Sequence, residues 1–367
     1  MKSQVQKFYQ QLHEMPEPGF REKRTSACLA GILRREGFQV TEGIAGTTGV
    51  AGTLRGARPG RTVVLRADMD ALPFSDEAGS VILRHACGHD ANSAMVLACG
   101  AALAADGLPG GELRLLFQPA EELLLGAKAM IRGGAVEGAD AIVGIHLRPA
   151  GEAGLHQATP ALCHGACGLL EFDILGKCAH GGRPHLGVNA IDAAVLAVGA
   201  VNAIRQDPQS GGSAKATCLR SFGAAANCIP DRVRLCLDLR ARNDCAMDRL
   251  AEQAKRAVLS GAAAAGAQAS SLREDYTAAA DYDSGLVEEA RRAIEEVLGR
   301  ALPPIPTPGS EDFHFYRSLA GVPSVYIGLG ADMRQGLHAP DMAFDLDALE
   351  DGVQILTALV RRLLPPA

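Results

Sequence analysis

The sequence predicts an α/β protein with a mostly parallel sheet and a smaller inserted α+β unit. Apolar runs of strand length alternate with helical patterns over residues 1–160, which is typical of strand–helix–strand units. The pattern then changes to about four strands and two helices, and the strand–helix alternation returns near the end of the chain. We therefore expect one discontinuous domain over residues 1–166 and 278–367, interrupted by a domain over residues 167–277.

The first two helices and the first strand are predicted from apolar spacing and from turn residues. "FYQQLHEMPEPGFREKRTSACLAGILRREGF" contains two helices joined by a Pro/Gly turn, and the second ends at Gly37. "RTVVLRADMDALP" is a buried strand that ends in acidic residues and is stopped by Pro73. "ANSAMVLACGAALAADG" is a helix that Gly107 ends, with Asp90 or Asn92 as its expected N-cap.

The next strands end in polar residues. "GELRLLFQPAEE" is a strand with a proline break, "GAKAMIRGGAVEG" is a helix and "ADAIVGIHLRP" is a strand. In parallel sheets, ligands bind beyond the carboxyl ends of the strands. The residues that we expect to meet there are Asp68, Asp70, Glu121, Glu122 and His146.

Composition limits the classes of partner. The net charge is -6 and no long basic run occurs, so nucleic acid and anionic membranes are not expected as partners. Apolar stretches are too short to span a bilayer, and the polar N-terminus lacks the apolar core of a signal peptide. The ten cysteines show no C-x-x-C pairing, which favours reduced, buried thiols. We therefore expect a cytoplasmic protein.

The stretch "RHACGHD" places His85, Cys87 and His89 on every second position. Thiolate, imidazole and carboxylate groups are the protein ligands of zinc and its neighbours. In an extended loop, residues two apart point the same way, so Cys87 and His89 could face one metal, and Gly88 lets the backbone approach closely. A triplet that binds nothing is an equally good interpretation of this stretch alone.

The pair Glu121–Glu122 in "FQPAEE" favours hydrolytic chemistry. Adjacent side chains diverge, so one carboxylate can bind a metal while its neighbour takes a proton from water and gives it to a leaving amine. His146 at the end of an apolar strand and His338 after a glycine-rich loop are further candidate ligands. The alternatives are a solvated acidic pair at a helix start and a hydrogen-bonded core histidine.

Nine motifs together resemble one family nearly from end to end: "LHEMPEPGFRE", "LRADMDALP", "HACGHD", "FQPAEE", "DAIVGIHLRP", "AHGGRPH", "NCIPD", "SEDF" and "LHAPDMAFD". The chain resembles the metal-dependent aminoacylase and carboxypeptidase clan, in its amidohydrolase branch with hippurate hydrolases and indole-acetyl-amino-acid hydrolases. The resemblance implies a metallopeptidase-like catalytic domain with an inserted lid and dimerisation domain. It implies hydrolysis of N-acyl amino acids to a carboxylate and a free amino acid.

The resemblance also implies roles for single residues. Two divalent ions, which could be zinc, manganese, cobalt or nickel, would be bound by Cys87, His89, Glu122, His146 and His338. Glu121 would be the general base and acid. His180 would reach the active site of the second subunit of a homodimer and stabilise the oxyanion there. Asn227, and less strongly His185, would bind substrate.

The chain departs from the family pattern at Asn92, where a second histidine is usual, and at Cys178, where the lid motif usually has glycine. The family places Asp70 as support for a metal ligand, and a strand-end cap is its other interpretation. The departures leave the preferred substrate and metal open.

Three other functions remain open from the sequence. A carboxypeptidase or dipeptidase would use the same two-metal machinery. A cysteine-nucleophile hydrolase would pair Cys87 with His89 or His85 and would need neither the glutamate pair nor the distant histidines. A non-catalytic metal-binding protein would keep the ligands without turnover, and a complete ligand set together with Glu121 argues against it.

Overall fold

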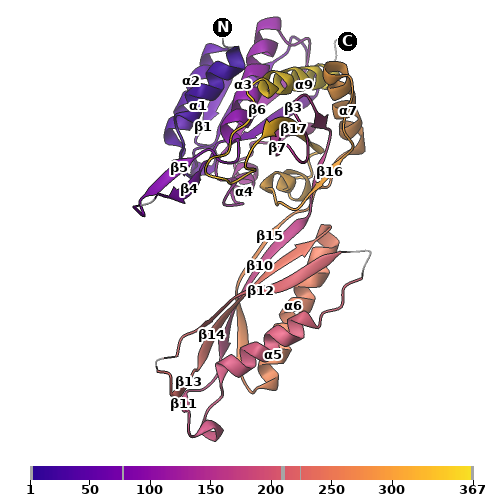
Figure 1. The fold of residues 1–367 in the computed structure, drawn as a ribbon. Coiled ribbons are helices and arrows are strands. Elements are labelled where there is room, and N and C mark those ends of the chain that lie inside the picture. Colours follow the sequence, from indigo (N-terminus) through magenta and orange to yellow (C-terminus); the bar gives the residue numbers. More distant parts are fainter. Residues whose placement is uncertain (1–2, 77, 208–210, 224, 365–367) are drawn as a thin grey trace. The chain divides into compact units, whose positions relative to one another are not determined.

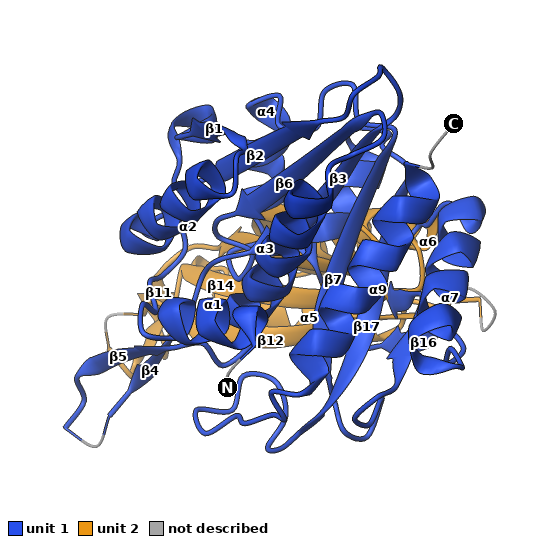
Figure 2. Ribbon diagram, turned by 90° about the horizontal axis from the view of Figure 1, so that it is seen from above, with its two compact units in different colours: residues 1–163, 281–307, 311–367 blue, residues 164–280, 308–310 orange. Residues whose placement is uncertain are grey.

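The structure, a computed structural model, describes residues 3–76, 78–207, 211–223 and 225–364. The chain divides into two compact units, which Figure 2 colours separately. Unit 1 consists of residues 1–163, 281–307 and 311–367, and unit 2 of residues 164–280 and 308–310. The sequence predicts the limits of the inserted domain at residues 167 and 277.

Unit 1 is built on a seven-stranded sheet with the order β1-β2-β6-β3-β7-β17-β8. Its central neighbours β6, β3, β7 and β17 run parallel, whereas the outer pairings are antiparallel. The α/β prediction is confirmed, and the sheet that we expected to be mostly parallel is mixed. The strands are β1 (Gln39–Glu42), β2 (Val50–Arg55), β3 (Thr62–Asp68), β6 (Glu112–Gln118), β7 (Ala141–Pro149), β8 (Ala158–Thr159) and β17 (Ser324–Met333).

Helices pack on this sheet and on one another (Figure 1). α3 contacts β3, β6 and β7 and is flanked by α1 and α9, and this explains why nearly all of its side chains are buried. α2 packs on β1 and β2, and α7 packs on β17 and α9. The helices of unit 1 are α1 (Gln4–His13), α2 (Lys23–Arg35), α3 (His89–Asp106), α4 (Gly126–Arg132), α7 (Ser284–Leu298), α8 (Phe315–Ser318) and α9 (Ala348–Leu363), with 3₁₀ turns η1 (Ile44–Gly46) and η3 (Asp312–His314).

The start of α3 differs from the expectation. Its N-cap is Gly88, which has a left-handed backbone with φ of 90°, and neither Asp90 nor Asn92 caps the helix. Glycine adopts this conformation without the steric cost that a side chain would add. The early start places His89 in the first turn and leaves the side chains of Asp90 and Asn92 free to bind His13 and Asp68 instead.

A hairpin between β3 and α3 was not expected. β4 (Leu72–Ser75) pairs with β5 (Val81–Arg84) in a two-stranded sheet, so Pro73 lies inside a strand and does not stop one. Proline is tolerated there because a two-stranded ribbon has only edge strands. β3 itself ends at Asp68, where the buried acidic residues begin.

Unit 2 has a four-stranded antiparallel sheet with the order β12-β14-β10-β15, and α5 and α6 pack together on one face of it (Figure 1). A short ribbon, β11 with β13, and the turn η2 lie outside this sheet. The elements of unit 2 are β10 (Ala166–Leu175), β11 (Ala179–His180), η2 (Pro184–Leu186), α5 (Ala190–Asn202), β12 (Gly212–Ser221), β13 (Cys228–Ile229), β14 (Arg232–Ala241), α6 (Asp244–Ala264) and β15 (Gln268–Thr277). The remaining short strands are β9 (Leu162–His164) and β16 (Ile305–Thr307).

The chain enters and leaves unit 2 at neighbouring points. Cys167 at the start of β10 lies opposite Thr277 at the end of β15, and the N–H of Ala280 donates to the carbonyl of His164 at 3.0 Å. The core of unit 2 is formed by the inner face of the sheet and by the alanine-rich faces of its two helices. Within the described part of the chain, the helices are all too short or too polar to cross a bilayer.

Candidate active site

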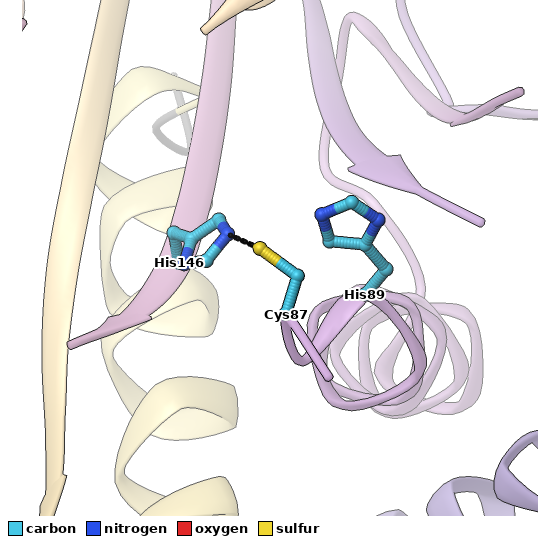
Figure 3. Close-up of side chains that lie close together, drawn as sticks. All are labelled: Cys87, His89 and His146. Atoms are coloured by element: carbon cyan, nitrogen blue, oxygen red, sulfur yellow. Dashed lines mark hydrogen bonds between the residues drawn. The ribbon is translucent and has the colours of Figure 1, made fainter. Parts of the chain in front are cut away.

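Three predicted ligands meet at the carboxyl end of the parallel strands of unit 1. Cys87 lies between the rings of His89 and His146, as Figure 3 shows. Cys87 Sγ is 3.6 Å from His146 Nε2, and the ring centroids of His89 and His146 are 5.8 Å apart. One donor atom from each of the three lies within 4.8 Å of the others, and all three side chains are buried. The loop before α3 and strand β7 therefore supply one compact donor group.

A second donor group shares Cys87 with the first. Cys87, Glu122 and His338 also offer donor atoms within 4.8 Å of one another. His338 Nε2 is 3.4 Å from Glu122 Oε1, and the N–H of His338 donates to the carbonyl of Ala86 at 2.7 Å. This hydrogen bond ties the loop of His338 to the loop of Cys87, so two adjacent positions for a cation have one thiol in common.

The donor set fits a metal. His89 Nε2 and Glu122 Oε1 are buried and have no hydrogen-bond partner in the described part of the chain. Such atoms are costly to bury, and a missing ion is a recognised reason for finding them. Thiol, imidazole and carboxylate ligands in one site suit zinc and neighbouring divalent metals.

Asp70 holds both the ligand His89 and the glutamate pair. His89 Nδ1 is 3.0 Å from the carbonyl of Asp70 and 3.3 Å from its carboxylate, so Nε2 is the nitrogen left to face the site. The carboxylate of Asp70 accepts the N–H of Glu121 at 3.1 Å and the N–H of Glu122 at 3.0 Å. Asp70 therefore supports the site, as expected, and reaches the glutamates as well.

A buried arginine network lies behind these residues. Arg66 is 1% exposed and donates to Asp68 at 2.7 Å, to Asp312 at 2.9 Å and to Glu311 at 3.2 Å. Asn92, at the position where the family pattern has histidine, donates to the other oxygen of Asp68 at 3.1 Å. Asn92 therefore takes part in this network and leaves the donor groups intact.

The electrostatics of the site favour a cation. Burial raises the pKa of the Glu121 carboxyl, and the negative charges of Glu311 and Asp312 raise it further. Burial lowers the pKa of His146 to about 4, so this imidazole is neutral and able to bind a metal at neutral pH. Burial also opposes a charged His89, but Asp68 and Cys87 outweigh it and raise the pKa of His89. A divalent cation would be stabilised by the same negative charges.

Sequence reasoning missed part of this environment. It assigned no role to Arg66, Gln118, Glu311 or Asp312, although the motifs "LRAD", "FQP" and "SEDF" contain them. Gln118 accepts from Arg66 and donates to Asp312, so the four form one connected set. A charged residue inside an otherwise apolar strand, as Arg66 is in "VVLRAD", was the available signal, since buried charges need partners.

The candidates of unit 2 lie in or next to its β11–β13 ribbon and in the turn η2. The N–H of Gly181 donates to the carbonyl of Asn227 at 2.7 Å, and His180 Nδ1 accepts the N–H of Gly182 at 3.0 Å. His185 follows in the turn η2. His180, His185 and Asn227 are all exposed, and their parts in a reaction stay predictions.

Known proteins resemble the chain over most of its length. It is 32% identical over 360 residues to a protein of Saccharolobus solfataricus named thermostable carboxypeptidase 1, an alignment that covers 93% of this chain and 90% of that protein. It is 32% identical over 252 residues to the hippurate hydrolase of Campylobacter jejuni, covering 66% of this chain and 65% of the relative. A structure described as a putative aminohydrolase from methicillin-resistant Staphylococcus aureus superimposes with a TM-score of 0.88 at 26% identity, over 98% of this chain and 96% of that one.

The resemblance drawn from the sequence motifs is thereby confirmed. The sequence pattern of one peptidase family matches residues 64–362, which include every donor residue of the site. The chain belongs to Peptidase family M20/M25/M40.

Proposed function

We propose that this protein is a metal-dependent amidohydrolase that cleaves the amide bond of N-acyl amino acids to give a carboxylate and a free amino acid. The observation that carries the proposal is the convergence of five donor residues from distant parts of the sequence beside a buried glutamate whose carboxylate lies 3.8 Å from one of them, His89. These donors are Cys87, His89, Glu122, His146 and His338, and the glutamate is Glu121.

Two divalent ions fit the two donor groups. Cys87 would bridge them, with His89 and His146 on one side and Glu122 and His338 on the other, a division that supports the proposal. When bound, zinc, manganese, cobalt or nickel would polarise the amide carbonyl and lower the pKa of water. Burial raises the pKa of the Cys87 thiol, and a coordinating metal deprotonates such a thiol.

Glu121 would transfer the proton. Its Oε2 lies 3.8 Å from His89 Nε2, and it is only 6% exposed, so it faces the donor groups from inside the protein. A raised pKa makes the carboxylate of Glu121 a stronger base toward water. The carboxylic acid that results can then give the proton to the leaving nitrogen. The N–H groups of Glu121 and Glu122, both bound by Asp70, hold the backbone from which this side chain extends.

The exposed residues of unit 2 would complete the site. His180 of a second copy would stabilise the negative charge that develops on the carbonyl oxygen, and Asn227 and His185 would bind the substrate. Exposed surface on unit 2 supports a homodimer: β12 is an edge strand exposed along most of its length, and Val195 and Leu196 of α5 are 57% and 47% exposed. The acidic composition and reduced cysteines support a cytoplasmic location.

A carboxypeptidase or dipeptidase activity is the second candidate. The relative named thermostable carboxypeptidase 1, which matches 93% of this chain, favours it. Both activities hydrolyse an amide beside a free carboxylate and would use Glu121 in the same way, so substrate preference alone separates them.

A cysteine-nucleophile mechanism is less consistent with the site. Cys87 does contact an imidazole, that of His146. However, this chemistry needs a thiolate, and burial raises the pKa of the Cys87 thiol even though His89 lies beside it. Burial also lowers the pKa of the contacting His146 to about 4.

A hydrolysis panel tests the proposal. The protein is stripped of metal by a chelator, reloaded with each divalent ion in turn and assayed on N-acetyl, N-benzoyl and indole-acetyl amino acids and on dipeptides. We expect metal-dependent turnover that is greatest on N-acyl amino acids. Preference for dipeptides would favour the second candidate, and activity that survives chelation but not alkylation would contradict both.

A further inference from the structure

A buried glutamate outside the site accepts a hydrogen bond from the loop that carries Glu121. Glu22, from the motif "PGFRE", is 0% exposed. Its Oε1 accepts the N–H of Ala120 at 2.9 Å and the N–H of Phe20 at 3.0 Å, and its Oε2 accepts the hydroxyl of Thr48. Its contacts in the described part of the chain include no cation, so all of its stabilisation comes from these donors and its own backbone.

The side chain of Glu22 makes no hydrogen bond to its own helix. Glu22 is the N-cap residue of α2, yet its side chain makes no capping hydrogen bond. Glu17 binds the first N–H groups of that helix instead, those of Arg24 at 3.1 Å and Thr25 at 2.9 Å. The carboxylate of Glu22 is therefore directed away from α2 and toward the loop after β6.

Three consecutive N–H groups of that loop bind buried carboxylates. Glu22 accepts from Ala120, and Asp70 accepts from Glu121 and Glu122. Ala120 has φ of 55° and Leu124 has φ of 56°, a left-handed conformation that residues with side chains adopt only when their surroundings hold them. The two carboxylates thus hold a loop conformation that the sequence "PAEELLL" would not adopt unaided.

Close packing between the two segments leaves little room for another arrangement. A Cβ added to Gly19 would lie 3.0 Å from Ala120 Cα and 3.0 Å from Leu123 Cδ1, so glycine is needed where the two loops cross. A Cβ added to Gly126 would lie 1.7 Å from the carbonyl oxygen of Pro119. The loop is therefore closely packed at both ends. The hydrogen bond to Glu22 holds the peptide of Ala120 between them.

We propose that Glu22 is a positioning residue for the reaction: through the N–H of Ala120 it fixes the backbone from which Glu121 reaches the scissile amide. The inference rests on the proposed function. Asp70 holds the same loop but also contacts His89, so its removal would disturb a metal ligand as well. Glu22 contacts none of the five donor residues, which makes it the cleaner probe.

The test compares Glu22→Ala with Glu22→Gln and with the control Glu17→Ala, all in the metal-loaded full-length protein on its best N-acyl amino acid. Misplacing a catalytic group by about 1 Å costs on the order of 100-fold in rate, so we expect Glu22→Ala to lower kcat by about 10- to 100-fold. KM and the ratio of metal to protein should stay as in the wild type.

The two companion variants separate positioning from folding. In Glu22→Gln the amide oxygen still accepts both N–H groups while its NH₂ group faces the Thr48 hydroxyl, so kcat should return to within about threefold of the wild type. Glu17→Ala loses helix-capping bonds of the same kind and should lower the melting temperature without lowering kcat. Hydrogen exchange gives a readout independent of turnover: the Ala120 amide should exchange faster in Glu22→Ala and at the wild-type rate in Glu17→Ala.

Several results would overturn the inference. They are a Glu22→Ala protein with kcat within about twofold of the wild type, a loss of metal that accounts for its lost rate, or an equal loss of kcat in Glu17→Ala. If Glu22→Ala does not fold, Glu22→Asp, which keeps the charge and shortens its reach, must show the lower kcat. A wild-type protein inactive on every N-acyl amino acid overturns the proposed function itself, whereas an active wild type with an unaffected variant overturns only the role of Glu22.

Discussion

In unit 1 the candidate residues are enclosed and held by neighbours, whereas in unit 2 they lie on the surface. His89 is 0% exposed and Cys87 7%, and each contacts several buried groups. His180 lies on the short β11–β13 ribbon and Asn227 directly precedes β13, and both side chains are exposed. The fold of unit 1 can set pKa values and ligand directions by itself. The candidate residues of unit 2 are exposed to solvent, so mutations in the two units should have different consequences for stability and metal content.

The largest effect is expected inside unit 1. Glu121→Gln should lower kcat by about 10²- to 10⁴-fold, because the amide cannot take a proton and general acid–base catalysis contributes about that much. The donor residues remain, so metal content measured by elemental analysis should not change. A variant with near-normal kcat would refute the assignment, and the surface variant Glu296→Gln serves as the control for a change of charge alone.

Removal of the shared thiol of Cys87 should lower the number of metal ions bound per chain. Cys87→Ala should bind at least one metal ion fewer per chain, because Cys87 belongs to both donor groups. Cys99→Ala is the matched control, since Cys99 is also a buried cysteine, lies in α3 and belongs to neither group. Unchanged metal content in Cys87→Ala would contradict its assignment as a ligand.

Mutation of the surface histidine of unit 2, His180, should lower kcat while leaving metal content and stability unchanged. His180→Ala should lower kcat by about 10²- to 10³-fold if His180 stabilises the oxyanion. Because the side chain is exposed, the free energy of unfolding should change by less than about 0.5 kcal/mol and metal content should stay constant. Normal turnover in this variant would contradict a role of His180 in the reaction.

The smallest effect is expected at an exposed ion pair of unit 1. This pair tests whether burial of a residue, rather than its place in unit 1, decides how large the effect of a mutation is. His156 Nδ1 lies 2.8 Å from Asp351, and the hydrogen bond to this carboxylate raises the pKa of His156 above 6.5. The pair therefore stabilises the fold below pH 6.5, and this contribution is lost as the pH rises through the raised value.

His156→Gln should accordingly lower the free energy of unfolding more at about pH 5.5 than at about pH 8.5, and by less than about 1 kcal/mol because the pair is solvent-exposed. Denaturant unfolding of wild type and variant at both pH values measures the difference. A variant effect that grows with pH would show that the charged histidine is not what stabilises the pair.

The sequence could indicate which residues carry metal-binding side chains and would lie together, while their roles stay predictions. Cys87, His89, Glu122, His146 and His338 were expected as ligands, and the structure brings them into two overlapping groups. The α/β architecture was predictable for a related reason, because apolar runs and glycine or proline breaks report directly on strands and helices. Side-chain chemistry and apolar periodicity can both be recognised within short stretches of the sequence.

Residues that act through a backbone group of another segment could not be predicted. Glu22 and Ala120 are far apart in the sequence, and nothing in "FREK" indicates that this carboxylate accepts an N–H from "QPAEE". Asp90 or Asn92 was expected as the helix cap, but the helix starts earlier, after the left-handed Gly88, and Asn92 donates to Asp68 instead. Such contacts depend on tertiary packing, which a local pattern does not contain.

The neighbouring entry and exit of unit 2 have a practical consequence. Because β10 starts opposite the end of β15, the two joints of the insertion lie side by side, as they do in domains that tolerate transplantation. A relative's insertion could be grafted between these joints without lengthening the connecting segments. Chimaeras of this kind would reveal which half of the molecule dictates the choice of acyl group.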